Sequence, residues 1–442
     1  MYLDFVNIGF LLYFLPLFFI FYAITPGKWK NVTLFLGSAI FYILGEPVSL
    51  LVLPVSILLN YLFGLLLDKG GKKGILCLAI AGNLMVLAGF KLHGGVIPLG
   101  LSFYTFQAIS YLADIYRGEI DSERNLGKFA LYMGMFPKIG SGPIVAYGDI
   151  KDALTKRGMT AEGFQKGMQL FILGLSAKVL LADRLQILWH DLEVAGYESV
   201  TWRYAWIGAI AFSLKLYFDF HGYSLMAIGL GRMMGFSLPD NFKTPYLSRS
   251  VREFYRRWHI TLGVWFRKYV YIPLGGNRKG EGRTILNLLA VWILTGLWHG
   301  FSVNFFLWGL FLWCLIVLER WVERLNFVKK LKILPHLYLW FVIPISWMFF
   351  AIPDKELLQI YLNRMFGLGE VYNGNILDYW IAIQRHGGIL AVSILCASGI
   401  VEKIQRKNEK APWLNAILAC LFWLCVWKIF RQGSNPFQYV NF

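Results

Sequence analysis

Two histidines stand where ionisable side chains are costly. His299 lies in residues 285–318, a stretch without Lys, Arg, Asp or Glu, and His259 follows the run "RRW". An imidazole in an apolar segment must find a hydrogen-bond partner, line a wet cavity or take part in a reaction. Because neutral imidazole can remove a proton from a hydroxyl group, one hypothesis is general-base catalysis. A hydrogen bond between helices explains His299 equally well, so the residues alone leave both interpretations open.

A basic, aromatic-rich segment, residues 240–283, surrounds His259 and could bind a phosphorylated ligand. Guanidinium groups hold phosphate through paired hydrogen bonds, and aromatic rings stack on bases. The spacing predicts that His259 shares a helical face with Arg252 and Arg256. An amphipathic helix at the membrane interface is the alternative interpretation. The candidate donor-binding residues are Arg252, Arg256, Arg257, Arg267 and Trp258.

The composition predicts the kind of fold that holds these candidate residues in place. Of 442 residues, 57% are hydrophobic and 16% charged, with mean hydropathy +0.53, whereas soluble domains carry about 25% charged residues. Apolar runs recur along the whole chain, which predicts an all-α, polytopic membrane protein with about eleven transmembrane helices plus re-entrant or amphipathic segments. No hydrophilic stretch is long enough for a soluble domain, so residues 1–442 are expected to form a single membrane-embedded domain. The N-terminal apolar run reads as a retained span.

The charges are dispersed rather than gathered into a module. The net charge of +17 comes from basic clusters in short loops, as expected for cytoplasmic loops under the positive-inside rule. This dispersion argues against nucleic acid as a partner. The five cysteines show no CxxC spacing, so neither a disulfide framework nor a metal site is implied.

The predicted position of the basic loops allows the depth of His299 in the membrane to be estimated. Counting from Thr284, next to the basic cluster at 278–283, Trp298 is residue 15 of an apolar run, which rises about 22 Å as a helix. The hydrocarbon core is about 30 Å thick. His299 is therefore expected in the outer half of the membrane, followed by Gly300, which can break the helix.

Other polar or aromatic residues in apolar runs are candidates for lining a polar channel. Hydrogen bonds between helices explain the polar ones as well. These tunnel-lining candidates are Asp219, Trp298, Gln107 and Tyr104.

Five stretches together resemble a known family. They are "PLGLSFYTFQAISYLADIYRG" (98–118), "FPKIGSGPIV" (136–145), "YFDFHGYSLMAIGLGRMMGF" (217–236), "NFKTPYLSRSVREFYRRWHITLGVWFRKYVYIPLGGNR" (241–278) and "LTGLWHG" (294–300). Covering most of residues 98–300, they resemble the membrane-bound O-acyltransferase (MBOAT) superfamily, in its bacterial alginate O-acetyltransferase-like branch.

The resemblance implies a fold and an activity. The fold would be a ring of helices around a central tunnel that joins a cytoplasmic donor funnel to an extracellular acceptor funnel. The family's hallmark histidines map onto His259 and His299, with catalysis assigned chiefly to His299. An acyl group, expected to be acetyl, would pass from acetyl-CoA or an acyl-carrier thioester, with no bound cofactor, to a hydroxyl at the outer face.

The resemblance also implies partners and a location. The acceptor would be a cell-surface polysaccharide or exopolysaccharide, reached directly or through a secreted or membrane-anchored acetyltransferase partner. The protein would lie among the lipids of a bacterial inner membrane as a multi-pass protein.

Two departures from the family pattern leave alternatives open. His221 stands where serine is expected, and Lys268 where aspartate is expected. The second departure removes a carboxylate and puts the donor in question. Relatives that transfer D-alanine to teichoic acid use a carrier protein, although "YIPLGGNR" favours the polysaccharide-acetylating branch. A transporter or a non-catalytic assembly platform is the other class, but no inverted repeat of the kind common in transporters is visible.

The predicted topology can be tested with single cysteines in a background that lacks the native five. Cysteines at Lys72, Lys330 and Lys407 should be modified only by reagents that reach the cytoplasm, because their loops are basic. A cysteine at Asp354 should react with an impermeant reagent added outside. Modification of position 72 from outside would contradict the topology on which the depth of His299 depends.

Overall fold

The regular structure of this chain is helical. The computed structural model describes residues 3–437 except 47, 69, 71, 94, 95, 324–332, 369–374, 434 and 436. Within these residues the only β pairing is an isolated antiparallel bridge between Phe242 and Trp258. The all-α prediction is confirmed, while Lys330 and its basic loop lie outside the described residues.

The helices differ widely in length. Three short π-helical turns, Phe10–Phe14, Ala177–Ala182 and Arg267–Tyr271, adjoin α-helices. The α-helices are α1 (Leu15–Ile24), α2 (Lys30–Gly45), α3 (Val52–Asp68), α4 (Lys73–Leu92), α5 (Leu101–Tyr116), α6 (Leu126–Gly134), α7 (Tyr147–Thr155), α8 (Ala161–Ser176), α9 (Asp183–Ala195), α10 (Trp202–Met233), α11 (Val251–Arg257), α12 (Ile260–Phe266), α13 (Glu281–His299), α14 (Val303–Val322), α15 (Leu334–Ala351), α16 (Lys355–Met365), α17 (Asp378–Ala397), α18 (Ile400–Lys407) and α19 (Pro412–Gln432).

The chain divides into two compact units, each made of separate stretches of sequence. The first unit comprises residues 1–176, 220–240 and 411–442, and the second comprises 177–219 and 241–410. The expectation that residues 1–442 act as one domain stays a prediction. Each unit is described by itself below.

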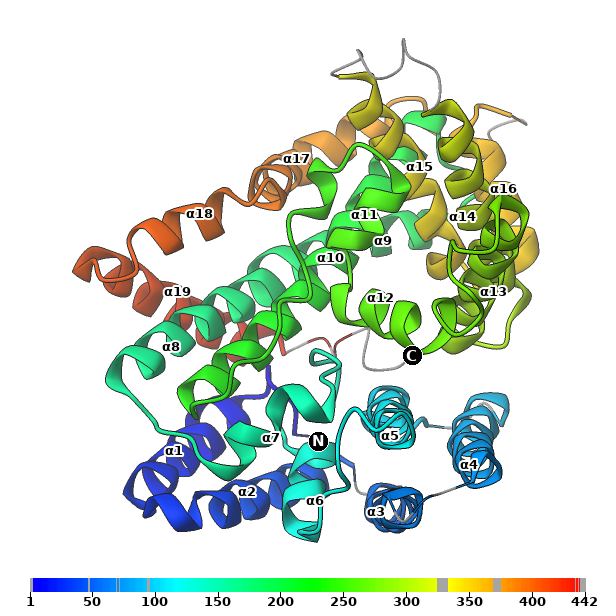
Figure 1. Ribbon diagram of the computed structural model, residues 1–442. Helices are drawn as coiled ribbons and strands as arrows, with labels where there is room; N and C mark the ends of the chain where they lie inside the picture. The colour runs from blue at the N-terminus through cyan, green and yellow to red at the C-terminus, as the bar shows by residue number, and fades with distance from the viewer. Residues whose placement is uncertain are drawn as a thin grey trace. The chain divides into compact units, whose positions relative to one another are not determined.

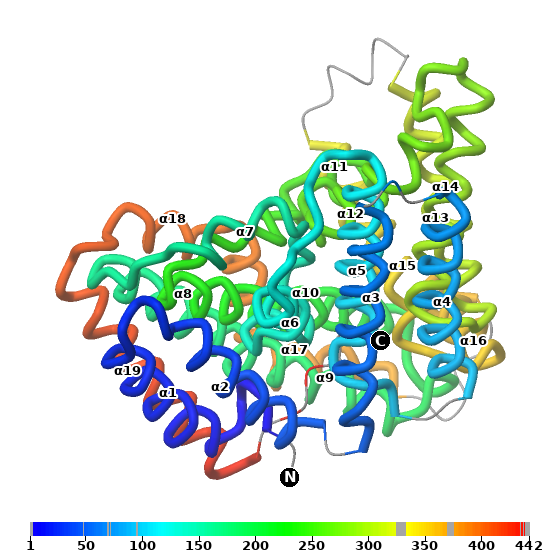
Figure 2. The backbone as a smooth tube through the Cα atoms, turned by 60° about the horizontal axis from the view of Figure 1, so that its bottom comes forward, coloured from blue at the N-terminus to red at the C-terminus, as the bar shows by residue number. Residues whose placement is uncertain are grey.

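In the first unit, α3, α4 and α5 lie side by side (Figures 1 and 2). Helix α5 is buried from Leu101 to Ile115 on all its faces, as expected of a helix at the centre of a bundle. Helix α4 instead exposes large apolar side chains, such as Leu78 and Met85 at 62% and 66% exposure. Exposed apolar side chains of this kind suit contact with lipid acyl chains.

Five described helices are long and apolar enough to cross a membrane. They are α4, α14, α15, α17 and α19, and the apolar helices Phe10–Ile24 and Val52–Asp68 are shorter. This supports a multi-pass membrane protein. The count of about eleven spans stays a prediction.

The second unit contains a tight helical hairpin. Helix α13 ends at His299, Gly300 is extended, and α14 begins at Val303, so the predicted break at Gly300 is confirmed. A Cβ added at Gly296 would lie 2.3 Å from the carbonyl oxygen of Phe305, and one at Gly309 would lie 2.5 Å from that of Trp292. The two helix backbones therefore touch where these glycines face the partner helix.

The close contact in the hairpin predicts that alanine substitutions at two glycines differ in their effect on stability. Gly309→Ala should push α14 away from α13 and destabilise the protein by about 1–3 kcal/mol, the usual effect of overpacking. Gly282→Ala is the matched control on α13, because a Cβ added there would have nothing within 4 Å. Thermal unfolding in detergent measures both, and equal midpoints for the two variants would contradict the close contact.

Candidate active site

His299 is enclosed by aromatic rings. It is the last residue of α13 and is 5% exposed. Its ring centroid lies 4.7 Å from that of Trp298, 5.4 Å from Trp308 and 4.9 Å from Phe350. Phe305 adds a fourth ring at 6.0 Å. An apolar enclosure of this kind keeps bulk water away from a reacting group.

His259 adopts a strained backbone between two short helices. It has φ 46° and ψ 54°, directly before α12, and is 2% exposed. The predicted helical face shared with Arg252 is wrong, because α11 ends at Arg257 and Trp258 is extended. Backbone pairing replaces the helix at this point. The N–H of Lys243 donates to the carbonyl of Arg257 at 2.9 Å, and that of Ile260 donates to the carbonyl of Asn241 at 3.0 Å.

One indole connects the two histidines. The Trp298 ring lies 6.1 Å from the His259 ring and 4.7 Å from the His299 ring, between centroids. Burial lowers the pKa of His259 to about 3, so this imidazole is uncharged at neutral pH. Trp258 packs on Phe254 and Trp347, with ring centroids at 5.4 and 5.0 Å, and is 3% exposed.

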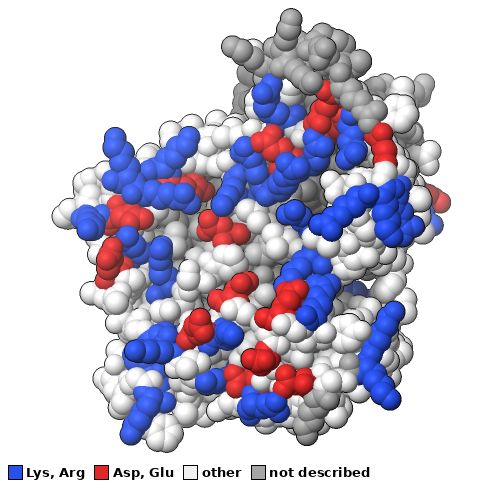
Figure 3. Space-filling view, in the orientation of Figure 1, with Lys and Arg blue, Asp and Glu red and all other residues white. Residues whose placement is uncertain are grey.

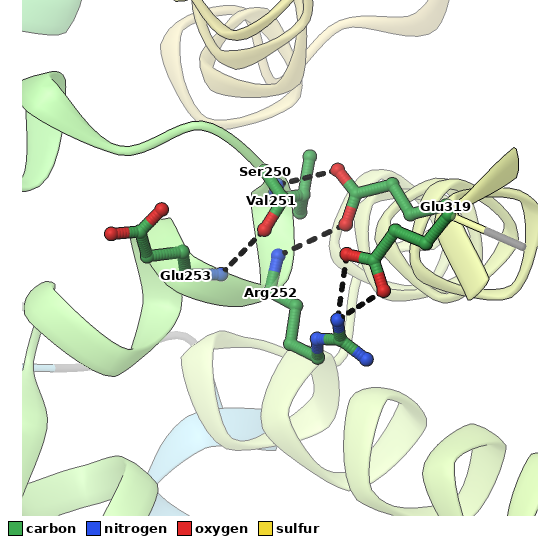
Figure 4. Close-up of polar contacts among 6 residues, drawn as sticks. Ser250, Val251, Arg252, Glu253 and Glu319 are labelled. Carbon is green, nitrogen blue, oxygen red and sulfur yellow. Dashed lines mark hydrogen bonds and ion pairs between the residues drawn. The ribbon is translucent and has the colours of Figure 1, made fainter. Parts of the chain in front are cut away.

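A carboxylate on α14 holds the beginning of α11 (Figure 4). Glu319 accepts hydrogen bonds from the backbone N–H of Val251 at 2.5 Å and of Arg252 at 3.2 Å. Ser250 caps the same turn by accepting from the N–H of Glu253 at 3.1 Å. The free N–H groups at the start of a helix need such acceptors. Glu319 thus fixes α11 to α14.

The candidate arginines fall into two groups. Arg252 forms an ion pair with Glu323 at 2.5 Å, and Arg257 pairs with Glu253 at 2.5 Å. Arg256 and Arg267 are exposed. In the described part of the chain neither of them forms a salt bridge. Figure 3 shows basic side chains gathered over α11 and the segment between α12 and α13.

Asp219 belongs to a buried ion cluster in the second unit. Its carboxylate accepts from Nζ of Lys178 at 2.8 Å, and the same ammonium lies 2.9 Å from Asp183. Asp219 is 1% exposed. A buried carboxylate is tolerated when it is paired in this way. The sequence reasoning missed Lys178, which lies 41 residues before its partner.

Tyr104 and Gln107 lie on the buried helix α5 of the first unit. Gln107 accepts a hydrogen bond through Oε1 from Lys138, whose ammonium also lies 5.0 Å from the centroid of the Tyr132 ring. Lys138 is fully buried, and burial lowers its pKa to about 7. The Tyr104 hydroxyl has no hydrogen-bond partner among the described residues.

Lys138 was not named from the sequence as a site residue, although its isolation from other charges could have identified it. It is the sole charged residue between Lys128 and Asp149. The two departures from the family pattern belong to different units. His221 is buried in the first unit, and Lys268 lies in the second unit with its ammonium 5.2 Å from the centroid of the Tyr269 ring.

Comparison with known proteins gives a consistent result. Residues 119–353 match the membrane-bound O-acyltransferase family. The chain is 34% identical to the "Probable alginate O-acetylase AlgI" of Pseudomonas putida, over 98% of this chain and 99% of the relative. It is 28% identical to the peptidoglycan O-acetyltransferase of Helicobacter pylori, over 98% and 96%. Identity to the teichoic acid D-alanyltransferase of Bacillus subtilis is 27%, over 55% and 63%. The chain therefore belongs to the membrane-bound O-acyltransferase family, and it is an O-acyltransferase.

Proposed function

We propose that this protein transfers an acetyl group from acetyl-CoA, bound from the cytoplasm, to a hydroxyl at the outer face of a bacterial inner membrane. The acceptor is a polysaccharide, or a secreted or membrane-anchored partner that passes the acetyl group to one. The observation that carries this proposal is the aromatic enclosure of His299, in which the Trp298 ring contacts both His299 and His259.

His299 acts as the general base. It takes the proton from the acceptor hydroxyl while the oxygen attacks the thioester carbonyl carbon. The carbon–sulfur bond then breaks, and the departing thiolate takes the proton from the imidazolium. The aromatic enclosure supports this role because it limits hydrolysis of the thioester by water. His259, uncharged at neutral pH, assists on the donor side.

The donor enters through a narrow tunnel within a ring of about eleven helices, in which Trp298, Asp219, Gln107 and Tyr104 are lining residues. Pantetheine is long and slim, so the thioester reaches His299 while the phosphates of coenzyme A stay near the basic segment. Arg256 and Arg267 bind these phosphates through charge-assisted hydrogen bonds. Arg252 and Arg257 orient the segment through their own ion pairs.

The relatives support acetyl transfer to a polysaccharide over the alternatives. Two of them carry O-acetylation of alginate or peptidoglycan in their names and align along nearly the whole chain. The D-alanyl-transferring relative covers about half of it, so D-alanyl transfer from a carrier protein is the second candidate. A transporter or assembly platform would not need the chemistry of His299.

His299→Ala should lower acetyl transfer by about 10²–10⁴-fold, the usual contribution of a general base. The assay uses purified protein in proteoliposomes, with labelled acetyl-CoA and an acceptor selected with the wild type from alginate and peptidoglycan fragments. His190→Ala is the control, because His190 is exposed. Transfer by His299→Ala within about twofold of wild type would leave only the packing interpretation.

Arg256→Glu should raise the KM for acetyl-CoA about tenfold or more, while the KM for the acceptor changes little, because a charge-assisted phosphate contact is replaced by repulsion. Lys407→Glu is the matched control. It reverses an exposed basic charge on α18 that is predicted to face the same side. An equal effect of both variants would mean that the donor responds only to total charge.

A further inference from the structure

The ring of Trp308 stands edge-on to that of His299 and carries a polar group without a protein acceptor. The two ring planes make an angle of 88°, with centroids 5.4 Å apart. Trp308 is 2% exposed, and its Nε1–H has no hydrogen-bond partner among the described residues. A buried indole N–H ordinarily finds an acceptor, so one that does not requires an explanation.

The explanation must be an acceptor, because an indole N–H can only donate. Aromatic rings surround Trp308 closely. Its centroid lies 4.8 Å from that of Phe350 and 5.9 Å from that of Trp292. A ligand oxygen next to His299 is a partner that would satisfy this donor without moving the enclosure.

We propose that Trp308 is a catalytic residue whose Nε1–H stabilises the negative oxygen formed during acyl transfer. The proposal rests on the proposed function. When the acceptor oxygen attacks the thioester carbonyl carbon, a carbon–oxygen bond forms and the π electrons move onto the carbonyl oxygen. His299 holds the proton of the acceptor hydroxyl at this stage. The oxyanion then accepts a hydrogen bond from Trp308, the carbonyl re-forms, and the thiolate leaves with the proton from His299.

The geometry supports this role, because base and donor must face one reacting carbon from different directions. The two ring centroids lie 5.4 Å apart and the planes make an angle of 88°, so one bound acyl group can contact both side chains. A donor aimed at developing charge in a dry site contributes far more than it does in water. The close hairpin contact at Gly309, the next residue, holds the indole in place.

Trp347 provides a matched control. Its ring stacks on Trp308, with centroids 6.1 Å apart and planes at 26°, and it is 1% exposed. Its nearest ring neighbours include Trp258 at 5.0 Å and Phe350 at 5.3 Å, between centroids. Removing the N–H from either indole therefore disturbs similar packing, whereas the ring of Trp308 lies edge-on to that of His299.

The experiment replaces each indole with 3-benzothienylalanine, in which sulfur takes the place of N–H within nearly the same shape. At Trp308 the kcat for acetyl transfer from acetyl-CoA should fall by about 10²–10³-fold, the usual effect of losing one oxyanion donor. The KM for acetyl-CoA should stay within about threefold, because the contact strengthens only in the transition state. At Trp347 both constants should stay within about threefold of wild type. Trp308→Phe should reproduce the loss of kcat.

The outcomes separate this inference from the proposed function. If Trp308→3-benzothienylalanine keeps its kcat, or if both positions lose kcat equally, Trp308 is a packing residue and the inference is wrong. A rise in KM with unchanged kcat also overturns it, since the N–H would then bind the ground state. His299→Ala, measured in the same vesicles, tests the proposed function independently. If His299→Ala is inactive while the benzothienyl variant at Trp308 is active, the proposed function stands and only the role of Trp308 is contradicted.

Discussion

The close contact between α13 and α14 is the constraint on which the candidate active site depends. Glycines at 296 and 309 let the two backbones touch, and this contact brings the aromatic side chains of α14 against His299 at the end of α13. One larger residue in this contact would separate His299 from its aromatic enclosure. Helix α14 also carries Glu319, eleven residues after Trp308, or about 16 Å along the axis. One rigid helix therefore sets both the surroundings of His299 and the position of the basic segment.

The arginines of the basic segment differ in their ion pairing, which the net charge of the segment does not reveal. Arginines that look equivalent in the sequence differ in their partners, since Arg252 and Arg257 are neutralised within the protein whereas Arg256 and Arg267 face outward. Ion pairs with Glu323 and Glu253 orient the helix instead of adding to the positive field. The number of cations in this segment that are free of an ion pair is thus smaller than the sequence suggests.

Features that depend on local sequence could be predicted, and those that depend on distant contacts could not. The break at Gly300 follows from a glycine behind His299 in an apolar run, and the helical class follows from composition. The left-handed backbone of His259 was missed because it depends on pairing with residues 241–243. Trp308 reads as an ordinary core residue in an apolar helix, since only the folded hairpin brings it to His299. The contacts of Lys178 with Asp219 and of Lys138 with Gln107 join residues 41 and 31 positions apart, so neither contact follows from the local sequence.

The ion cluster around Lys178 has a consequence for how the chain is made. A polypeptide is synthesised from its N-terminus, so Lys178 is made well before Asp219 on α10. An unpaired ammonium in an apolar setting is costly. Asp183, five residues after the lysine and 2.9 Å away in the folded protein, can neutralise it at once within the same short segment. The segment thus carries its own counter-ion as soon as it is made, and Asp219 joins the cluster when α10 has been synthesised.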